Sequence, residues 1–395
     1  MNILFLCREY DRKVGYGGIG TYVDIVSRYL AKIGHKVFII CSIPRKVEEI
    51  IEKDNLVVYY AKQIHIKGVA RLFKILGLES VYSRLMCALT NYLAYKKLSK
   101  KYKIDIVETP EWYNEGLFFV LQKKIPVVCR IHGANFQLSR FIRKKGFFSK
   151  INDFLSNFFE TQCIKKSSYC IVPTNSVKEF IKRKFNQVKI EVIPIAISLD
   201  IFNELKVTKS KTKFVLCVGR IEKAKNTEVI VKAIPKILEY INDIKFLFVG
   251  RIFDSYGEYI KRLVKELRVN KYVKFISSLP WETLIRLYMF SDVIVKPSTE
   301  GTLDMSLLEA LASGTPLICS NIPSFKDVIE KSECGVLVDP YDVEGWSKAI
   351  VDVLTNEQRT KTIIINAKKV IKEKYSVEIV CNLLVKFYSQ LLGKN

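Results

Sequence analysis

The chain has 395 residues, of which 49% are hydrophobic, too many for one ordinary core and enough to fill two. Its 64 Lys and Arg residues outnumber 40 Asp and Glu residues and give a net charge of +24, so we expect an anionic partner: nucleic acid, an acidic membrane surface or a phosphorylated substrate. Ten scattered cysteines without a CxxC pair, and only three histidines, argue against a disulfide framework and a histidine-based metal centre.

The amino-terminal segment MNILFLCREYD has the pattern of a first strand. It lacks the basic, apolar and small-residue order of a signal peptide. No uncharged apolar run approaches the roughly 20 residues that a membrane-spanning helix needs. We therefore expect a cytoplasmic protein, either soluble or peripheral on the inner face of the cell membrane.

Short β-branched runs alternate with longer helical patterns along the whole chain. The first series of runs is NILFLC, HKVFIICSI, DIVET, PVVCRI, SYCIVPT and KIEVIPI, and the second is KFVLCVGR, KFLFVG, KYVKFI, DVIVKP, PLICS and GVLVD. This alternation predicts the α/β class, with two doubly wound domains built on parallel sheets. Ligands of such sheets bind beyond the carboxyl ends of the strands, so the turns that follow these runs are candidate sites.

A polar segment, DIFNELKVTKSKTK, separates the two series. We predict an amino-terminal domain at 1–199, a linker at 200–211 and a carboxyl-terminal domain at 212–374. The last segment, 375–395, is predicted to be a helix that packs back on the amino-terminal domain. The apolar face of that helix holds Val380, Leu384, Phe387 and Leu391.

Two of the turns have the composition of anion-binding sites. The first turn, DRKVGYGGIGTYV, precedes a helix and contains Gly15, Gly17, Gly18 and Gly20. Glycines let the backbone approach a ligand and present N–H groups to an anion, although a flexible connection explains them equally well. In VGRIEKAKN, Arg220 and Lys225 lie between a strand and a helix amino-terminus, which suits a phosphate or diphosphate.

Three further stretches carry candidate polar groups. His132 follows the strand PVVCRI, where a lone histidine is either structural or catalytic. Glu300, Asp304 and Glu309 lie in PSTEGTLDMSLLEA and can accept hydrogen bonds from sugar or ribose hydroxyls, with loop solvation and helix capping as the alternative for the first two.

The stretch ETPEWYNEG offers an aromatic plane and carboxylates that suit an acceptor sugar, and core packing of the tryptophan is the competing explanation. The residues concerned are Glu111, Trp112 and Glu115.

The segment 62–103 carries ten basic residues and one acidic residue, Glu79. A second basic patch, SRFIRKKGFFSK, places phenylalanines beside Arg140 and Lys144. Basic helices with apolar faces suit an anionic membrane surface. The alternative is that the apolar faces pack on the sheet while the lysines are solvated.

Taken in order, these stretches resemble the retaining nucleotide-sugar glycosyltransferases of family 4 (glycosyl transferases group 1). The matching pieces are GGIG, GHKVFII, the HG turn, VPTNSV, VGRIEKAKN, and PSTEG followed by LLEALASGTPLI. The resemblance covers nearly the whole chain and implies the GT-B fold, in which two Rossmann-like domains face each other across a cleft.

The resemblance also implies roles for individual residues. It makes Arg220, Lys225 and His132 the catalytic residues, the first two on the donor diphosphate and the histidine beside the donor sugar, and it gives the ribose hydroxyls to Glu309. The remaining implied donor-binding residues are Gly17, Gly18, Gly20, Gly219, Glu300, Gly301 and Asp304.

Two stretches depart from the family pattern. The family has two glutamates separated by seven residues, and counting back from Glu309 reaches Gly301, one position after Glu300. We expect Glu300 to replace the missing glutamate, with Asp304 or backbone groups as alternatives. In VIPIAISLD the family has an asparagine and a glycine before the aspartate, so Asp200 lies in a different turn.

By resemblance, the chain is expected to be a metal-independent retaining glycosyltransferase without a cofactor. It would move a sugar from a UDP-sugar or GDP-sugar to a glycan or lipid-linked acceptor in cell-surface polysaccharide or glycolipid synthesis. The alternatives are an inactive glycosyltransferase-like protein, a sugar-nucleotide epimerase or phosphorylase of the same fold, and a basic nucleic-acid-binding protein, for which the sequence has no recognition motif.

Overall fold

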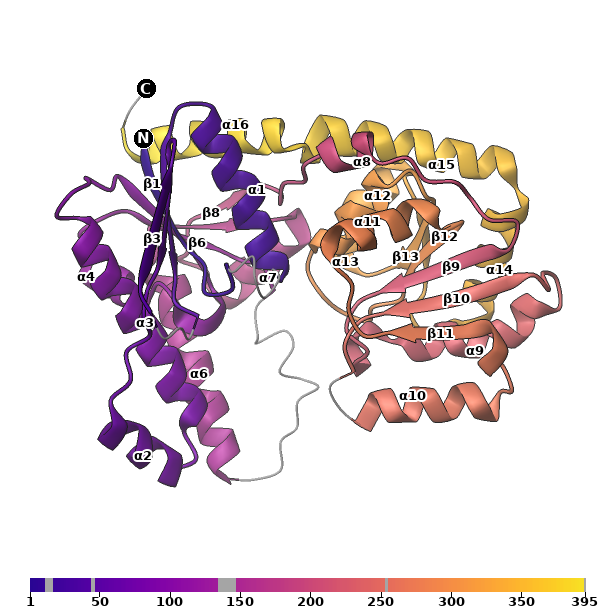
Figure 1. Ribbon diagram of the computed structural model, residues 1–395, viewed down its shortest axis with the longest axis horizontal. Coiled ribbons are helices and arrows are strands. Elements are labelled where there is room, and N and C mark those ends of the chain that lie inside the picture. Colours follow the sequence, from indigo (N-terminus) through magenta and orange to yellow (C-terminus); the bar gives the residue numbers. More distant parts are fainter. Residues whose placement is uncertain (11–16, 44–46, 134–146, 253–254, 394–395) are drawn as a thin grey trace. The chain divides into compact units, whose positions relative to one another are not determined.

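The computed structural model describes residues 1–10, 17–43, 47–133, 147–252 and 255–393 (Figure 1). The chain forms two compact units, one made of Met1–Ala196 with Val377–Asn395 and the other of Ile197–Ser376. The carboxyl-terminal helix thus belongs to the first unit. The segment 200–211, which we expected to be a linker, lies within the second unit, and its first part is the helix α8 (Asp200–Glu204).

In the described residues of the first unit, eight strands form one sheet, in the order β3-β4-β2-β1-β5-β6-β7-β8. All neighbouring pairs are parallel except β3 and β4, which are antiparallel. The strands are β1 (Asn2–Leu6), β2 (Lys36–Cys41), β3 (Glu49–Lys53), β4 (Leu56–Tyr60), β5 (Ile106–Pro110), β6 (Val127–Arg130), β7 (Tyr169–Val172) and β8 (Ile190–Val192). The edge strand β3 is exposed along its whole length.

Helices cover both faces of this sheet. Leu4 and Leu6 of β1 pack with side chains of the helices α3 and α4, and the alternate residues Ile3 and Phe5 are equally buried on the opposite face. The described α-helices of the first unit are α1 (Gly18–Lys32), α2 (Lys67–Ile75), α3 (Glu79–Leu98), α4 (Leu117–Gln122), α6 (Phe147–Lys166), α7 (Asn175–Lys184) and α16 (Val377–Leu391).

Buried polar contacts attach α16 to the first unit. Glu108, in β5, accepts hydrogen bonds from Tyr22 of α1 and Tyr388 of α16 and forms an ion pair with Arg130 of β6 at 2.9 Å. Arg130 also donates to the carbonyl of Ile193 at 3.2 Å. The side chains of Glu108, Tyr22, Tyr388 and Arg130 are all nearly inaccessible to solvent. This cluster therefore holds α1 and α16 against the centre of the sheet.

In the second unit, six described strands form a parallel sheet in the order β11-β10-β9-β12-β13-β14. The strands are β9 (Lys213–Val218), β10 (Ile244–Val249), β11 (Val273–Ile276), β12 (Val293–Lys296), β13 (Leu317–Ser320) and β14 (Val336–Val338). The longer helices are α9 (Thr227–Leu238), α10 (Ser255–Glu266), α11 (Trp281–Phe290), α12 (Met305–Ala312), α13 (Pro323–Ile329), α14 (Val343–Thr355) and α15 (Glu357–Val370).

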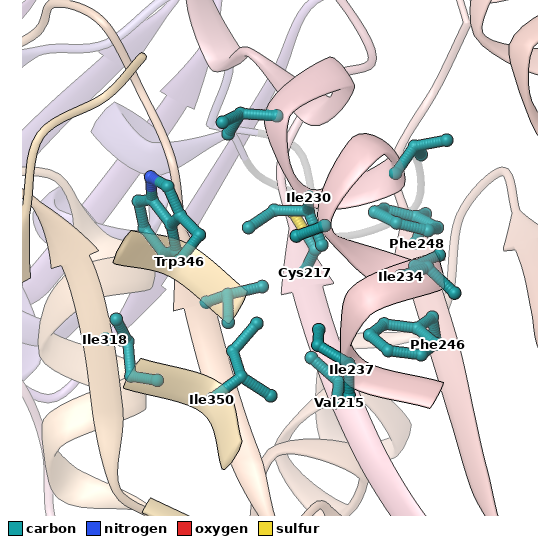
Figure 2. Close-up of a cluster of buried hydrophobic side chains, with 14 of the residues drawn as sticks. Val215, Cys217, Ile230, Ile234, Ile237, Phe246, Phe248, Ile318, Trp346 and Ile350 are labelled. Atoms are coloured by element: carbon teal, nitrogen blue, oxygen red, sulfur yellow. The ribbon is translucent and has the colours of Figure 1, made fainter. Parts of the chain in front are cut away.

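The core of the second unit lies between the sheet and the helices α9 and α14. Figure 2 shows Phe246 and Phe248 of β10 beside Ile234 of α9, with Trp346 and Ile350 of α14 completing the cluster. Strand residues on the other face, such as Leu216 and Ile294, are also fully buried. Both faces are therefore covered, as the near-continuous apolar runs require.

Candidate functional site

The turn that follows β9 holds the two cations singled out in the sequence. Gly219 has a φ of +152°, and a Cβ atom on Gly250 would come within 1.8 Å of the Gly219 carbonyl oxygen, so this close approach of two turns requires glycine. The side chain of Arg220 is 55% exposed and forms an ion pair with Glu222 at 3.0 Å. Lys225 ends a short helical turn immediately before α9.

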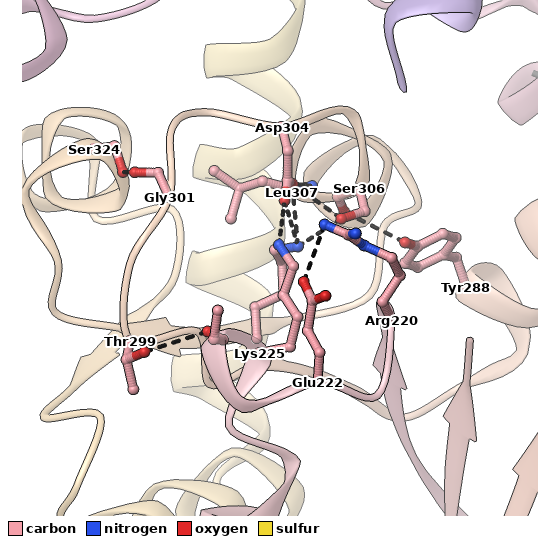
Figure 3. A network of polar contacts seen from close by, with 12 residues as sticks. Arg220, Glu222, Lys225, Tyr288, Thr299, Gly301, Asp304, Ser306, Leu307 and Ser324 are labelled. Carbon is pink, nitrogen blue, oxygen red and sulfur yellow. Dashed lines mark hydrogen bonds and ion pairs between the residues drawn. The ribbon is translucent and has the colours of Figure 1, made fainter. Parts of the chain in front are cut away.

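The turn that follows β12 packs directly on this first turn. The amide of Thr299 donates to the carbonyl of Ala224 at 3.0 Å. Asp304 is the N-cap of α12 and accepts from the amide of Leu307 at 3.0 Å. Its other oxygen lies 3.4 Å from the Nζ atom of Lys225 (Figure 3). The structure thus brings the predicted residues Lys225 and Asp304 together.

A third charged residue in this network was not among the sequence candidates. Lys296, the last residue of β12, contacts Asp304 and Ser306. Burial by itself would raise the pKa of Asp304, but Lys296 and Lys225 hold that pKa well below its usual range. Burial lowers the pKa of Lys225, and Asp304 partly opposes this effect. Asp304 is therefore an anion across the physiological pH range.

Glu309 is buried in α12 and accepts a hydrogen bond from the indole nitrogen of Trp281 at 3.0 Å. Burial raises the pKa of Glu309, and this hydrogen bond partly offsets the shift. The indole comes from α11, where Trp281 is 41% exposed. The carboxylate is thus oriented from one side by its neighbouring helix.

The backbone of the turn after β12 explains why the glutamate of the family pattern is absent at position 301. Gly301 has a φ of +143°, which residues with a side chain rarely adopt, and its carbonyl accepts from Ser324 at 2.7 Å. Glu300, the preceding residue, has a half-buried side chain. This conformation favours glycine at position 301. The acidic residue next to that position in the chain is Glu300.

In the first unit, Gly17 and the first amides of α1 contact the carboxylate of Glu9. One oxygen of Glu9 accepts from the amides of Ile19 and Gly20, both at 3.1 Å. A Cβ atom on Gly17 would come within 2.5 Å of the same oxygen. The glycine therefore permits an acid to cap this helix, a contact that the sequence analysis missed. Gly18 is exposed at the helix start, and Gly15 lies outside the described residues.

The turn of His132 is held by a buried glutamate. Glu111 accepts from the amides of His132 at 3.0 Å and Gly133 at 2.7 Å, and its side chain is fully buried. Burial raises the pKa of Glu111 to about 7, although the two N–H groups oppose the shift. We expected Glu111 at an acceptor sugar, but the structure directs its carboxylate to the backbone of this turn.

The imidazole of His132 lies with its centre 5.2 Å from the ring centre of Tyr22, in an edge-on arrangement. Burial, reinforced by the nearby Arg130 guanidinium, lowers the pKa of His132 to about 3. The ring is neutral at physiological pH, so it can donate or accept a hydrogen bond but does not supply a positive charge.

The other acceptor candidates lie in a strained turn after β5. Tyr113 and Asn114 both have left-handed backbones, with φ of 63° and 61°. Trp112 is half-buried with its ring centre 5.3 Å from that of Tyr113. Glu115 is buried, which raises its pKa to about 8. The guanidinium of Arg8 lies 4.2 Å from the Tyr113 ring centre, and Trp112, Tyr113 and Arg8 are all half-buried.

Comparison with known proteins accounts for both units. The family described as Glycosyltransferase Family 4 matches residues 16–201, and the family described as Glycosyl transferases group 1 matches residues 201–370. The chain belongs to the family-4 glycosyltransferases. Its resemblance to that family, inferred from the ordered motifs, is thereby confirmed.

Two relatives of this glycosyltransferase match most of the chain. An uncharacterized glycosyltransferase of Methanocaldococcus jannaschii is 27% identical over 74% of this chain and 77% of the relative. A D-inositol 3-phosphate glycosyltransferase of Corynebacterium urealyticum is 22% identical over 95% of this chain and 91% of the relative.

Solved structures establish the GT-B fold. Sucrose-phosphate synthase from Thermosynechococcus elongatus has a TM-score of 0.80 at 20% identity, with both chains fully covered. The Anabaena protein HepE in complex with UDP and glucose has a TM-score of 0.69 at 15% identity, over 99% of this chain and all of that chain. The predicted fold class is confirmed.

Other structural features bear on the site of this glycosyltransferase. In the described part of the chain, no group of three or more His, Cys, Asp or Glu side chains is arranged to hold a metal ion. No described helix is long and apolar enough to cross a membrane. Asp200 begins α8 and accepts from the hydroxyl of Ser198 at 3.1 Å.

Proposed function

We propose that this glycosyltransferase moves a sugar from a UDP-sugar or GDP-sugar to a glycan or lipid-linked acceptor in cell-surface polysaccharide or glycolipid synthesis. The observation that carries the proposal is the pair Arg220 and Lys225 in the turn ahead of α9. Two cations beside a helix amino-terminus match the charge of a diphosphate. The complex of HepE with UDP and glucose supports a uridine donor for this fold.

The two cations would act mainly on the leaving group. As the bond between the sugar and the donor phosphate breaks, negative charge grows on the nucleoside diphosphate, and Arg220 and Lys225 stabilise that charge. Since these cations supply the positive charge, the proposed reaction needs no metal ion and no cofactor. We propose retention of the anomeric configuration, with a donor phosphate oxygen assisting deprotonation of the acceptor hydroxyl on the same face.

The remaining donor contacts are those that the family resemblance implies, and the charge and burial of the residues are compatible with them. The neutral ring of His132 offers a hydrogen bond to the donor sugar. The carboxylate of Glu309, oriented by Trp281, accepts from the ribose hydroxyls. Glu300 takes the sugar-contacting role of the family glutamate, because the backbone of Gly301 disfavours a side chain there.

For the acceptor we propose the turn after β5. Trp112 supplies aromatic surface, and Arg8, which lies over the Tyr113 ring, supplies a cation. Glu111 and Glu115 are buried, so we assign them to the support of this turn and not to direct contact with the acceptor. An aromatic surface with a guanidinium suits a sugar that carries a negatively charged substituent.

Calorimetric titration of the purified protein with UDP, GDP and ADP tests the donor site. We expect one nucleotide to bind and its binding to be lost in the double variant Arg220→Ala/Lys225→Ala. The matched control is Lys232→Ala, which removes an exposed cation of α9 that pairs with Glu228. If none of the three nucleotides binds to the folded protein, the proposal fails and the nucleic-acid-binding alternative gains weight.

The proposal includes binding to an anionic membrane surface through α2. None of the α2 residues is buried, and Leu72 and Ile75 are 54% and 73% exposed. Lys67, Arg71 and Lys74 are exposed on the same helix. In contrast, α3 buries an apolar face, so the packing alternative applies to that part of the basic segment. The second basic patch, 139–150, lies almost entirely outside the described side chains.

Sedimentation with phosphatidylglycerol vesicles tests this surface. The double variant Leu72→Glu/Ile75→Glu should lower the bound fraction, because it replaces apolar contacts with charges that the anionic surface repels. Leu121→Glu, on α4, alters a leucine of similar exposure (49%) away from α2 and should leave binding unchanged. Equal sedimentation of all three proteins would rule out α2 as the membrane contact.

A further inference from the structure

Lys296, the last residue of β12, is a buried cation beside the proposed donor site. It has no role in the mechanism proposed above. Its side chain is only 3% exposed, and its Nζ atom lies 3.1 Å and 3.2 Å from the two oxygens of Asp304. The same atom lies 2.5 Å from the hydroxyl oxygen of Ser306. Ser306 in turn donates to Asp304 at 2.9 Å. Lys296 is thus closely paired with Asp304 in a site that a ligand does not reach.

Lys225 contacts the same carboxylate more loosely. Its Nζ atom reaches a single oxygen of Asp304 at 3.4 Å, and its side chain remains 25% exposed (Figure 3). Two ammonium groups therefore share one carboxylate, which leaves one positive charge in excess. The accessible one of the two is Lys225, and Arg220 in the same turn adds a further exposed cation.

An acidic residue in a diphosphate site needs a counter-ion of its own. Without one, Asp304 would repel the ligand phosphates and would also hold Lys225 away from them. The partial burial of Asp304 strengthens both effects, because it reduces the screening by water. Lys296 removes this conflict, since it neutralises Asp304 from the interior of the unit.

We propose that Lys296 is a positioning residue of the donor site, which keeps Asp304 neutralised so that Lys225 is released to the diphosphate of the donor. Asp304 caps α12 and, together with Lys296, orients Lys225 before the ligand binds. This inference rests on the proposed donor site. It assigns Lys296 no direct contact with the ligand, because its side chain is buried.

A double-mutant cycle tests the inference, with the nucleotide that binds the native protein as the probe. Lys296→Met should weaken nucleotide binding about tenfold, because Asp304 then keeps Lys225. Asp304→Asn should bind at least as tightly as the native protein, since asparagine is an equally good N-cap and carries no charge. The double variant should return to within about threefold of native affinity, a rescue that marks coupling between the two side chains.

A second Lys–Asp pair of the same unit provides the matched control. Lys213 of β9 forms an ion pair with Asp292 at 3.5 Å, and the corresponding cycle of Lys213→Met and Asp292→Asn should leave nucleotide affinity unchanged. Salt dependence gives an independent measurement. Asp304→Asn should make nucleotide binding more sensitive to NaCl, because it leaves Lys296 and Lys225 without their carboxylate.

The outcomes separate this inference from the function on which it rests. If the native protein binds no nucleotide, the donor site itself fails, and the role of Lys296 fails with it. If the native protein binds and Lys296→Met binds equally well, only the role of Lys296 is overturned. It is also overturned if the double variant binds as weakly as Lys296→Met, because a merely structural lysine gives no rescue. Should Lys296→Met not fold, weaker binding by Asp304→Asn than by the native protein overturns it.

Discussion

The two units use acidic side chains in opposite ways at their candidate turns. In the first unit, Glu9 and Glu111 each accept two backbone N–H groups and so fix the shape of a turn. In the second unit, Asp304 accepts one N–H group but is mainly balanced by Lys296 and Lys225. In the first unit, the backbone N–H groups that could bind an anion already donate to the two glutamates. In the second unit, one positive charge remains available. The difference favours the second unit as the place where the donor phosphates bind.

The comparison predicts the largest loss of stability at Glu111. Glu111→Ala should lower the free energy of unfolding by about 2–5 kcal/mol, because it removes the acceptor of the His132 and Gly133 amides and leaves a cavity in place of a fully buried side chain. Urea denaturation followed by circular dichroism measures this loss. Glu191→Ala, which removes an exposed glutamate of β8, should change the same quantity by less than about 0.5 kcal/mol. Equal effects of the two substitutions would show that the turn does not depend on Glu111.

The converse prediction concerns Lys225, whose loss should affect binding rather than folding. Lys225→Ala should weaken nucleotide binding by about 1.5–3 kcal/mol, the usual contribution of a hydrogen bond to a charged group. Calorimetry measures the affinity, and urea denaturation should show a smaller change in stability, because the ion pair with Asp304 is partly exposed. A large loss of stability with unchanged affinity would reverse the comparison between the units.

A pH dependence follows from the buried acids of the first unit. Burial raises the pKa of Glu115 to about 8, so the folded protein binds more protons than the unfolded chain. The contribution of Glu115 to stability is therefore complete below its ordinary pKa and is lost as the pH rises through about 8. The slope is at most about 1.4 kcal/mol per pH unit. Denaturation measured between pH 5 and pH 9 should show a flatter profile for Glu115→Gln.

Glu111 contributes to the same slope at a lower pH, since its pKa is about 7. Below about pH 7 both acids therefore contribute to the slope, and between about pH 7 and pH 8 Glu115 contributes most of it, so the slope that Glu115→Gln loses should end near pH 8. An unchanged profile in that variant would mean that Glu115 is ionised in the folded protein despite its burial.

The fold and much of the donor turn were predictable from the sequence, because both depend on local patterns. Apolar runs followed by turn residues mark the strands, and the cations of VGRIEKAKN follow such a run directly. Two strands were missing from the predicted series: β3, where EIIEK is an exposed edge strand without alternating burial, and β4, whose apolar run LVVYY is largely buried. The polar segment 200–211 begins with a short helix, α8, which its composition does not indicate.

The contacts that shape the turns could not be predicted, because they join residues that no periodicity connects. Glu9 meets amides ten and eleven positions later along the chain. Lys296 ends an apolar run and looks like the solvated end of a strand, until Asp304 is placed beside it. Glu111 was predicted to contact a ligand because the sequence does not indicate whether an acid in a loop is buried.

The smallest predicted effect concerns the turn that lacks the family glutamate. Gly301 and Gly68 both have open space around the position of a Cβ atom, but only Gly301 has a positive φ, of +143°. Gly301→Ala should therefore lower the free energy of unfolding by about 1–3 kcal/mol through backbone strain alone. Gly68→Ala, in α2, should be neutral or stabilise by up to about 1 kcal/mol, since alanine favours a helix. If the two substitutions have the same effect, backbone strain does not exclude a side chain at position 301, and the shift of the glutamate to Glu300 needs another cause.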